Sequence, residues 1–169
     1  EVIRYKHNYK EGKKHGLIES FYKNGKNMTL SNYEEGVTHG LQEYFYENGQ
    51  LENRYVDVQG VKNGLYESYY ENGQLEKDAN YKDGNKIGQW TYFYEDGRRD
   101  GQWTYFNEDG GRDGQWIWYY ENGQVWKERN FKTGKRDGQW TWYYENGQIK
   151  GEGLNYIKAV MILTLSQHF

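Results

Sequence analysis

Two consecutive stretches decide the fold: GLQEYFYENG at residues 40–49 and GLYESYYENG at residues 64–73. They start 24 residues apart, and both place aromatic residues directly before a Glu-Asn-Gly sequence. Related decapeptides begin at Gly16, Gly88, Gly101, Gly114 and Gly138. Self-similarity at such a period is typical of a repeat protein in which each unit is one supersecondary motif.

Each unit has the pattern of a β-hairpin. Residues 65–71 are rich in Tyr, as strands are, and Asn72-Gly73 is the pair preferred in a two-residue type I′ turn. A second strand then runs from Gln74 to about Tyr81. Helix is disfavoured because Gly recurs often and no 3.6-residue period is present. The sequence predicts an all-β fold: an elongated, single-layer antiparallel meander of about thirteen strands, forming a twisted, curved open sheet.

The repeats also set the predicted domain boundaries. The repeat domain covers residues 1–153, with a half repeat at 1–15 and units starting at residues 16, 40, 64, 88, 114 and 138. We interpret residues 88–113 as one 26-residue hairpin in which Trp90 opposes Trp103. Residues 154–169 do not follow the repeat. Because repeat proteins must protect an open sheet edge, we expect this tail to form a capping strand or helix, the alternative being a disordered terminus.

The turn sets the register, and opposed residues share a face of the sheet. The opposed pairs predicted in this way are Tyr70–Leu75, Ser68–Lys77, Tyr66–Ala79, Gly64–Tyr81, Trp116–Arg129 and Trp118–Lys127. The last two pairs place cations over indole rings. One face is therefore expected to be aromatic and the other mostly polar, with Trp126 pointing to the second face.

Composition indicates a folded chain whose core is aromatic. Leu, Ile, Val and Phe are only 29 of 169 residues, but 32 residues are Phe, Trp or Tyr and the net charge is only −3. Disorder instead combines low hydrophobicity with high net charge and few aromatics. A nucleic-acid partner is not expected, because such domains are usually strongly basic. No apolar run reaches the roughly 18 residues of a membrane helix, so we expect a soluble protein, cytoplasmic or exported after loss of a leader.

Residues suited to catalysis or metal binding do not recur in a useful arrangement. The chain has no Cys, which excludes disulfides and a Cys nucleophile. His15 and His39 occupy equivalent turns about 10 Å apart, too far for one zinc ion. Acid pairs such as Glu34-Glu35 lie at turns, where neighbouring side chains point apart rather than across a cleft. We predict a protein that is not an enzyme and has no catalytic residue, metal or cofactor.

The aromatic face is the predicted binding site for a partner. All seven tryptophans lie between residues 88 and 144, whereas residues 16–81 contain none. Exposed aromatic patches mark binding sites and Trp is enriched in hot spots, although the same stripe can serve as the core. The candidate residues are Trp90, Tyr92, Trp103, Tyr105, Trp116, Trp118, Trp140 and Trp142.

A second candidate surface lies along one long edge of the sheet. The Asn-Gly turns carry mainly acids, and the opposite turns carry mainly Lys and Arg. Basic groups close to a membrane bind anionic lipid at about 1 kcal/mol each, although ordinary solvated turns explain the same pattern. The candidate residues are Lys10, Lys13, Lys14, Lys132, Lys135 and Arg136.

The unit GxWxxYYxNGQLxxxxxYKxGKxxG resembles MORN repeats, especially the bacterial variant often described as an antitoxin component. The resemblance covers residues 1–153, with Asp57 in place of an aromatic residue and Leu in place of Trp after Gly16, Gly40 and Gly64. It implies an elongated meander that acts as a scaffold, binding another protein or phospholipid without catalysis. An antitoxin or immunity-type partnership with another protein is the expected form, and a homo-oligomer is compatible.

Trp and Tyr-Tyr before Asn-Gly also resemble the choline- and cell-wall-binding repeats, which implies carbohydrate or choline binding through the aromatic face. Those units are nearer 20 residues, and their Trp directly precedes Tyr-Tyr. Here Thr141 and Trp142 separate Trp140 from Tyr143. This alternative ranks second.

Overall fold

The computed structural model describes residues 4–105 and 112–154, with the side chains of residues 102–105 excepted. In this part of the chain all regular structure is β-strand. The strands are β1 (Tyr5–Lys6), β2 (Tyr9–Lys10), β3 (Lys13–Lys14), β4 (Gly16–Phe21), β5 (Asn27–Glu34), β6 (Val37–Phe45), β7 (Leu51–Val58), β8 (Val61–Tyr69), β9 (Leu75–Lys82), β10 (Asn85–Phe93), β11 (Arg99–Tyr105), β12 (Arg112–Tyr119), β13 (Val125–Lys132), β14 (Lys135–Tyr143) and β15 (Ile149–Leu154).

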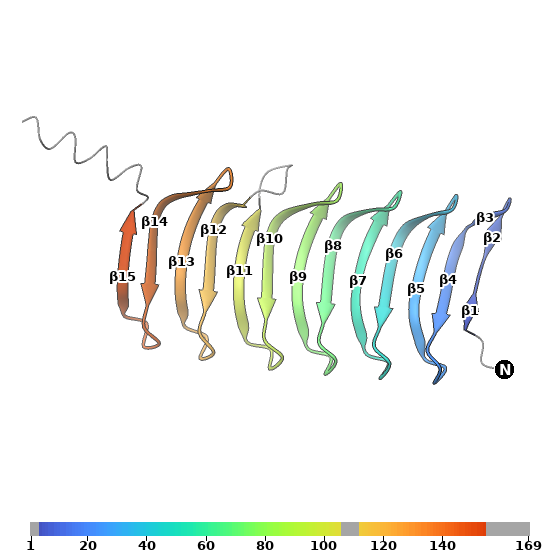
Figure 1. Ribbon diagram of the computed structural model, residues 1–169, viewed down its shortest axis with the longest axis horizontal. Helices are drawn as coiled ribbons and strands as arrows, with labels where there is room; N and C mark the ends of the chain where they lie inside the picture. The colour runs from blue at the N-terminus through green and yellow to red at the C-terminus, as the bar shows by residue number, and fades with distance from the viewer. Residues whose placement is uncertain (1–3, 106–111, 155–169) are drawn as a thin grey trace, which may run out of the picture.

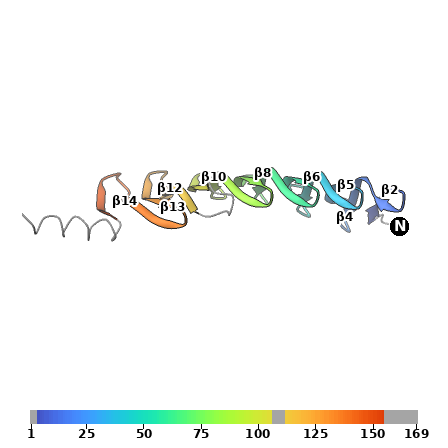
Figure 2. The same cartoon turned by 90° about the horizontal axis from the view of Figure 1, so that it is seen from above.

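The strands form one 13-stranded antiparallel sheet whose order follows the chain, from β1 and β4 through β15. β2 and β3 pair with each other as a short ribbon between β1 and β4 in the sequence. Figure 1 shows the strands side by side in a single row. Thirteen strands at roughly 4.8 Å each give the row a length of about 60 Å. Figure 2 shows that the row is one layer deep and that its two ends do not meet. The predicted open, single-layer meander is confirmed.

Most of the predicted register is also confirmed. The observed cross-strand partners include Gly64–Tyr81, Tyr66–Ala79, Ser68–Lys77, Trp90–Trp103, Trp116–Arg129 and Trp118–Lys127. The predicted pair Tyr70–Leu75 is wrong, because Leu75 lies opposite Tyr69. The predicted cap at residues 154–169 lies outside the described residues, apart from Leu154 at the end of β15.

The turn at Asn72-Gly73 explains the wrong pair. Only Gly73 has a positive φ, of 86°. The Tyr70 N–H donates to the Gln74 carbonyl, and the Gly73 N–H donates to the Tyr70 carbonyl, both at 2.8 Å. These bonds define a three-residue loop ending in a left-handed glycine, not the two-residue type I′ turn predicted from Asn-Gly. Paired positive φ values occur at the opposite edge instead, as in Asp83 (49°) and Gly84 (80°).

The longer loop produces a β-bulge at the start of each return strand. Between β8 and β9, Ser68 pairs with Lys77 and Tyr69 pairs with Leu75, which leaves Glu76 as the extra residue. The Ser68 hydroxyl donates to Glu76 Oε2 at 2.7 Å, so Glu76 lies on the same face as Ser68. We call the site twelve residues after each repeat glycine the bulge position. It holds Met28, Glu52, Glu76, Asp100, Trp126 and Lys150.

The core lies on the face that carries the rings, which we call the aromatic face. Its buried apolar residues are Ile18, Ala79, Trp90, Trp116 and Phe131. Neighbouring rings contact one another along the row: Tyr44 and Tyr55 are stacked with centroids 5.9 Å apart, and Tyr81 and Trp90 meet edge to face at 5.1 Å. The buried Gln42 amide donates to the Asn32 carbonyl at 2.9 Å, which satisfies its nitrogen. A one-layer sheet thus buries a core beneath its own long side chains.

Side chains at the Asn-Gly edge bond each repeat to the next. In the units that begin at Gly16, Gly40, Gly64 and Gly114, the second Tyr of the Tyr-Tyr or Phe-Tyr pair donates to a backbone carbonyl 23 residues later, and so does the amide of the turn Asn. The tyrosine bonds are Tyr22–Phe45, Tyr46–Tyr69, Tyr70–Phe93 and Tyr120–Tyr143, at 2.6 to 2.8 Å. The asparagine bonds are Asn24–Glu47, Asn48–Glu71, Asn72–Glu95 and Asn122–Glu145, at 2.8 to 2.9 Å.

The 26-residue unit changes this pattern at Asp96, which stands where the other units have Asn. A carboxylate can accept the Arg98 N–H, as Asp96 does at 3.0 Å, but it cannot donate to the next turn. The Arg98 guanidinium donates to the Glu121 carbonyl instead. The hydroxyl of Tyr94 bonds the Asp100 side chain, and this bond raises the pKa of Tyr94.

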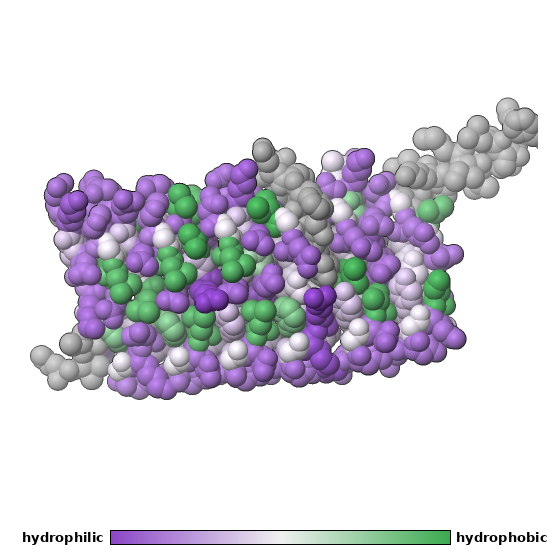
Figure 3. All heavy atoms as spheres, turned by 180° about the vertical axis from the view of Figure 1, so that it is seen from behind, coloured by the Kyte–Doolittle hydropathy of each residue, from purple (hydrophilic) through white to green (hydrophobic). Residues whose placement is uncertain are grey.

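The opposite face, which we call the back face, is less polar than predicted in its N-terminal half. Leu17, Leu41 and Leu65 are exposed there, Leu65 at 47%. Figure 3 shows hydrophobic atoms gathered over the N-terminal strands and fewer toward the C-terminal end. In the C-terminal half the same row holds Asn130 and Gln139, and the exposed Leu154 lies at its end. The prediction of a mostly polar second face is therefore right only for the C-terminal half.

Candidate functional site

The predicted binding residues divide into buried and accessible groups. Trp90 is 2% exposed and Trp116 is 7% exposed, so both belong to the core and offer little surface to a partner. Tyr92, Trp118, Trp140 and Trp142 are partly buried, with part of each ring open to solvent. Trp103 and Tyr105 have their backbone in β11, next to the partners that the register assigns them. Their side chains lie outside the described part of the structure.

Trp126 is an accessible tryptophan that the register argument placed on the wrong face. It occupies the bulge position of β13 and is 41% exposed. Its ring lies 6.4 Å from that of Tyr120, and Lys127 Nζ lies 5.2 Å from its centroid and 4.4 Å from that of Trp118. A bulge sets two residues of one strand opposite a single residue of its neighbour. Strict alternation therefore fails at residue 126.

A groove of about 520 Å³ opens on the aromatic face at the C-terminal end of the sheet. It is lined by Trp126, Trp140, Trp142, Lys150, Gly151 and Glu152. Glycines at positions 151 and 153 lie opposite Trp142 and Trp140. A Cβ on Gly153 would be 2.3 Å from Trp140 Cζ2, so the indole rests directly on the backbone of β15. The structure thus brings Trp126, Trp140 and Trp142 together around one hollow.

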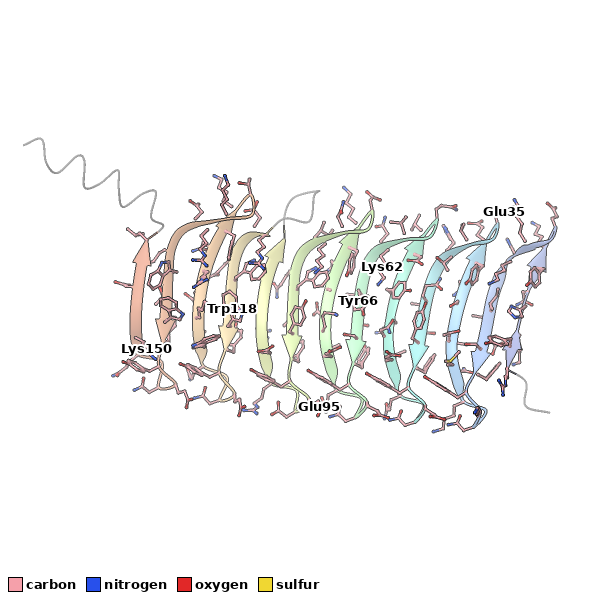
Figure 4. All side chains as sticks on the ribbon, in the orientation of Figure 1. Glu35, Lys62, Tyr66, Glu95, Trp118 and Lys150 are labelled. Carbon is pink, nitrogen blue, oxygen red and sulfur yellow. The ribbon has the colours of Figure 1, made fainter. Side chains whose placement is uncertain are left out.

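Cations lie over the rings along the rest of the aromatic face. The residue two before the repeat glycine supplies most of them. Lys62 Nζ lies 4.3 Å from the Tyr55 ring and 4.7 Å from the Tyr66 ring, and Lys86 Nζ lies 4.5 Å from Trp90. Figure 4 shows Lys62 beside Tyr66. Such contacts contribute about 0.5–1 kcal/mol each when exposed, and they give this face a cationic surface above its aromatic core.

A carboxylate lies beside one of the cations of the middle repeats, Lys77, whose Nζ is 4.9 Å from the Tyr66 ring. Burial lowers the pKa of Lys77, and the adjacent charge of Glu76 acts in the opposite direction. At the same face Asp57 is buried and accepts a hydrogen bond from the Thr38 hydroxyl at 2.6 Å. Burial also raises the pKa of Tyr55 and Tyr66. The middle of the aromatic face thus combines packed rings with charges of both signs.

The basic residues predicted to bind lipid lie at two ends of one edge. Lys10, Lys13 and Lys14 belong to the N-terminal ribbon, and the other three belong to the turn between β13 and β14. The two groups are about ten strands, or roughly 48 Å, apart. Lys13 pairs with Glu35 at 3.0 Å, and Lys14 Nζ lies 4.9 Å from the Tyr33 ring. Lys132 and Lys135 are cross-strand partners, and Arg136 is paired with Phe131. The six cations therefore do not make one patch.

The described ranges contain neither a cluster of metal-ligating side chains nor a helix that could cross a membrane. No group of three or more His, Cys, Asp or Glu residues lies close enough there to hold a metal ion. His39 Nδ1 lies 3.7 Å from Glu34, and His7 stacks on Tyr5 at 5.6 Å. Residues 4–105 and 112–154 also contain no helix of the length and apolarity needed to cross a membrane.

Four segments match one known repeat family, described as the MORN repeat variant: residues 38–55, 62–83, 112–133 and 136–158. They cover half of the chain, and each starts two residues before a repeat glycine, at the slot that usually holds a cation over the rings. The chain belongs to the MORN repeat variant family. MORN repeats are a non-enzymatic repeat type that commonly binds proteins or membranes. No curated protein matches the chain.

Proposed function

We propose that this MORN repeat chain is a non-enzymatic scaffold that binds another protein through the C-terminal part of its aromatic face. The observation that supports this most is the groove between β13 and β15, where three indoles meet at a partly open surface. Trp side chains that fill or line such hollows dominate interface energetics. In the middle of the sheet the equivalent rings are buried or covered by lysines, so the accessible indoles concentrate at one end.

The surrounding chemistry favours a protein partner over a catalytic role. Each repeat presents the same row of rings and cations, which multiplies a surface without creating one distinctive set of reactive groups. A partner that the chain neutralises, as an antitoxin or immunity protein does, is one form that such binding takes. Anionic lipid is a less favoured ligand because the basic edge is divided into two distant groups of three.

The test is capture of a partner from cell extract by the immobilised chain and by two double variants. Trp118→Ala with Trp142→Ala removes two accessible indoles of the aromatic face. Leu41→Ala with Leu65→Ala removes an equal number of exposed side chains from the back face and serves as the control. Since the loss of a single hot-spot residue costs about 2 kcal/mol or more, which is about 30-fold in affinity, we expect the first variant to bind at least about 30-fold more weakly and the control to bind normally.

Two outcomes would contradict the proposal. One is a captured protein that both variants retain, and the other is loss of capture in the control alone. Vesicles of phosphatidylcholine with and without phosphatidylglycerol provide the lipid comparison. Retention on the anionic vesicles that disappears at high salt, without any protein partner, would assign the chain to membrane binding instead.

A further inference from the structure

Two cations of β13 are each framed by tryptophans of the neighbouring strands. They project from the aromatic face, between β12 on one side and β14 on the other. The cross-strand sets are Trp118–Lys127–Trp142 and Trp116–Arg129–Trp140. Lys127 Nζ lies 4.4 Å from the Trp118 centroid, and the Arg129 guanidinium carbon lies 5.6 Å from that of Trp142. Figure 4 shows the indole of Trp118 within this group of strands.

The equivalent cation of an earlier repeat, Lys77, has a carboxylate beside it at the bulge position, and that carboxylate is missing here. The bulge position holds Glu52, Glu76 and Asp100 in the three preceding units, and it holds Trp126 here. In the described ranges, no carboxylate lies within ion-pairing distance of Lys127 or Arg129. The Nε atom of Arg129 is buried and has no hydrogen-bond partner among the described residues.

The neighbouring charges that shift the pKa values of Lys127 and Arg129 are all positive. Burial lowers the pKa of Lys127, and the neighbouring Arg129 and Arg136 lower it further. Burial and Arg136 likewise lower the pKa of Arg129. By contrast, the nearby Glu76 favours the charged form of Lys77, which occupies the slot of Lys127 in an earlier unit. An anion brought from outside would relieve this repulsion and satisfy the buried guanidinium nitrogen.

The spacing of the two cations indicates which kind of anion fits. Lys127 and Arg129 are two residues apart on one strand, which separates their backbone positions by roughly 6.8 Å. Alternate side chains of an extended peptide have the same separation of roughly 6.8 Å. The flanking indoles offer apolar surface to the residues on either side of such a carboxylate pair.

We propose that β12–β14 bind an extended acidic segment of a partner protein, with two carboxylates at alternate positions meeting Lys127 and Arg129. The inference rests on the proposed scaffold function and specifies the chemistry of its partner. Trp126 has two roles in it: its ring adds to the groove, and its presence at the bulge position leaves the cations free for a ligand carboxylate.

The test uses a capped nonapeptide of sequence SLSESESLS, together with versions in which both Glu are replaced by Gln or by Lys. Binding to the full chain is followed by tryptophan fluorescence and calorimetry. We expect the acidic peptide to bind at least tenfold more tightly than the Gln peptide, with an affinity that decreases as salt increases. The Lys peptide should not bind measurably. Equal affinity for the acidic and Gln peptides would overturn the inference.

The most informative variant is Trp126→Glu, which restores the carboxylate of the other repeats at an exposed position. It should reduce the affinity for the acidic peptide at least tenfold while the urea midpoint stays equal to or above that of the wild type. Lys127→Gln with Arg129→Gln should abolish the preference for Glu over Gln. Lys77→Gln, in the acid-balanced repeat, is the matched control and should bind normally. Unchanged binding by Trp126→Glu would contradict the inference.

Failure of this inference can be separated from failure of the scaffold function. If Trp118→Ala with Trp142→Ala loses the captured partner but Trp126→Glu retains it, the scaffold function stands and the acidic segment is wrong. If anionic vesicles bind the chain and Trp126→Glu abolishes that binding, while the acidic peptide does not bind, the ligand is a lipid surface and the inference is also wrong.

Discussion

The hydroxyl group of Tyr70 should contribute about 1 kcal/mol to the stability of the sheet. It donates to the Phe93 carbonyl of the next repeat at 2.8 Å. A typical intramolecular hydrogen bond has a net value of about 0.5–1.5 kcal/mol. Tyr70→Phe keeps the ring and deletes only this bond. The expected loss is therefore about 1 kcal/mol in the free energy of unfolding, equivalent to about 2–4 °C in melting temperature for a chain of this size.

The assay is urea unfolding followed by circular dichroism and tryptophan fluorescence. Tyr144→Phe is the matched control, because Tyr144 occupies the same slot in the last unit. Its ring is 48% exposed, and its hydroxyl makes no hydrogen bond within the described residues. We expect the control to unfold like the wild type. Tyr46→Phe should resemble Tyr70→Phe, since Tyr46 bonds the Tyr69 carbonyl at 2.8 Å.

Equal stability of Tyr70→Phe and wild type would refute the inter-repeat role of the hydroxyl. Equal destabilisation by Tyr70→Phe and Tyr144→Phe would also refute it, because the effect would then come from the turn itself. Since stability in a repeat array depends on nearest-neighbour interfaces, the hydrogen exchange of the Phe93 region should increase in Tyr70→Phe, while the N-terminal strands keep their protection.

Three further predictions test the packing, the turns and the buried tyrosines. Gly153→Ala should displace the Trp140 indole, because the new Cβ would lie 2.3 Å from it. A red shift in tryptophan emission would show the displacement. Gly151→Ala should have little effect, because its Cβ would lie 4.0 Å from the Trp142 ring. Asn72→Asp keeps the acceptor for its own turn but removes the donor to the next one, and should lower the free energy of unfolding in urea by about 1 kcal/mol. Unchanged stability would contradict the contribution of the Asn72–Glu95 hydrogen bond between repeats. Burial raises the pKa of Tyr55 above the ordinary 10.0. Just above pH 10.0 its hydroxyl therefore stays protonated in the folded chain but ionises in the unfolded chain. The free energy of unfolding that Tyr55 contributes should be fully present below pH 10.0 and decrease above it. Tyrosinate absorbance should appear together with unfolding. Ionisation of Tyr55 without unfolding would argue against its burial.

Much of the fold follows from local sequence because every partner in the sheet is a neighbour in the chain. The repeat period, the hairpins and the pairing of Trp90 with Trp103 need only a turn and an alternating strand. The type of turn at Asn72-Gly73 was mispredicted because Asn-Gly suits two loops. The Asn72 side chain helps to select the longer one by accepting the Gln74 N–H at 2.8 Å. The domain boundary at residue 153 and the capping role of the tail stay predictions.

The sequence alone determined which rings of the regularly alternating positions share a face, but only the tertiary structure decided which of them a partner can reach. Alternation assigns Trp90 and Trp142 to the same surface, yet one is in the core and the other lines a groove, because exposure depends on the residues of neighbouring strands. Lys86 lies over Trp90, whereas the small Gly151 lies opposite Trp142. Trp126 reaches the aromatic face through a bulge that shifts the register by one residue. Burial is a property of several strands together, and no single repeat contains that information.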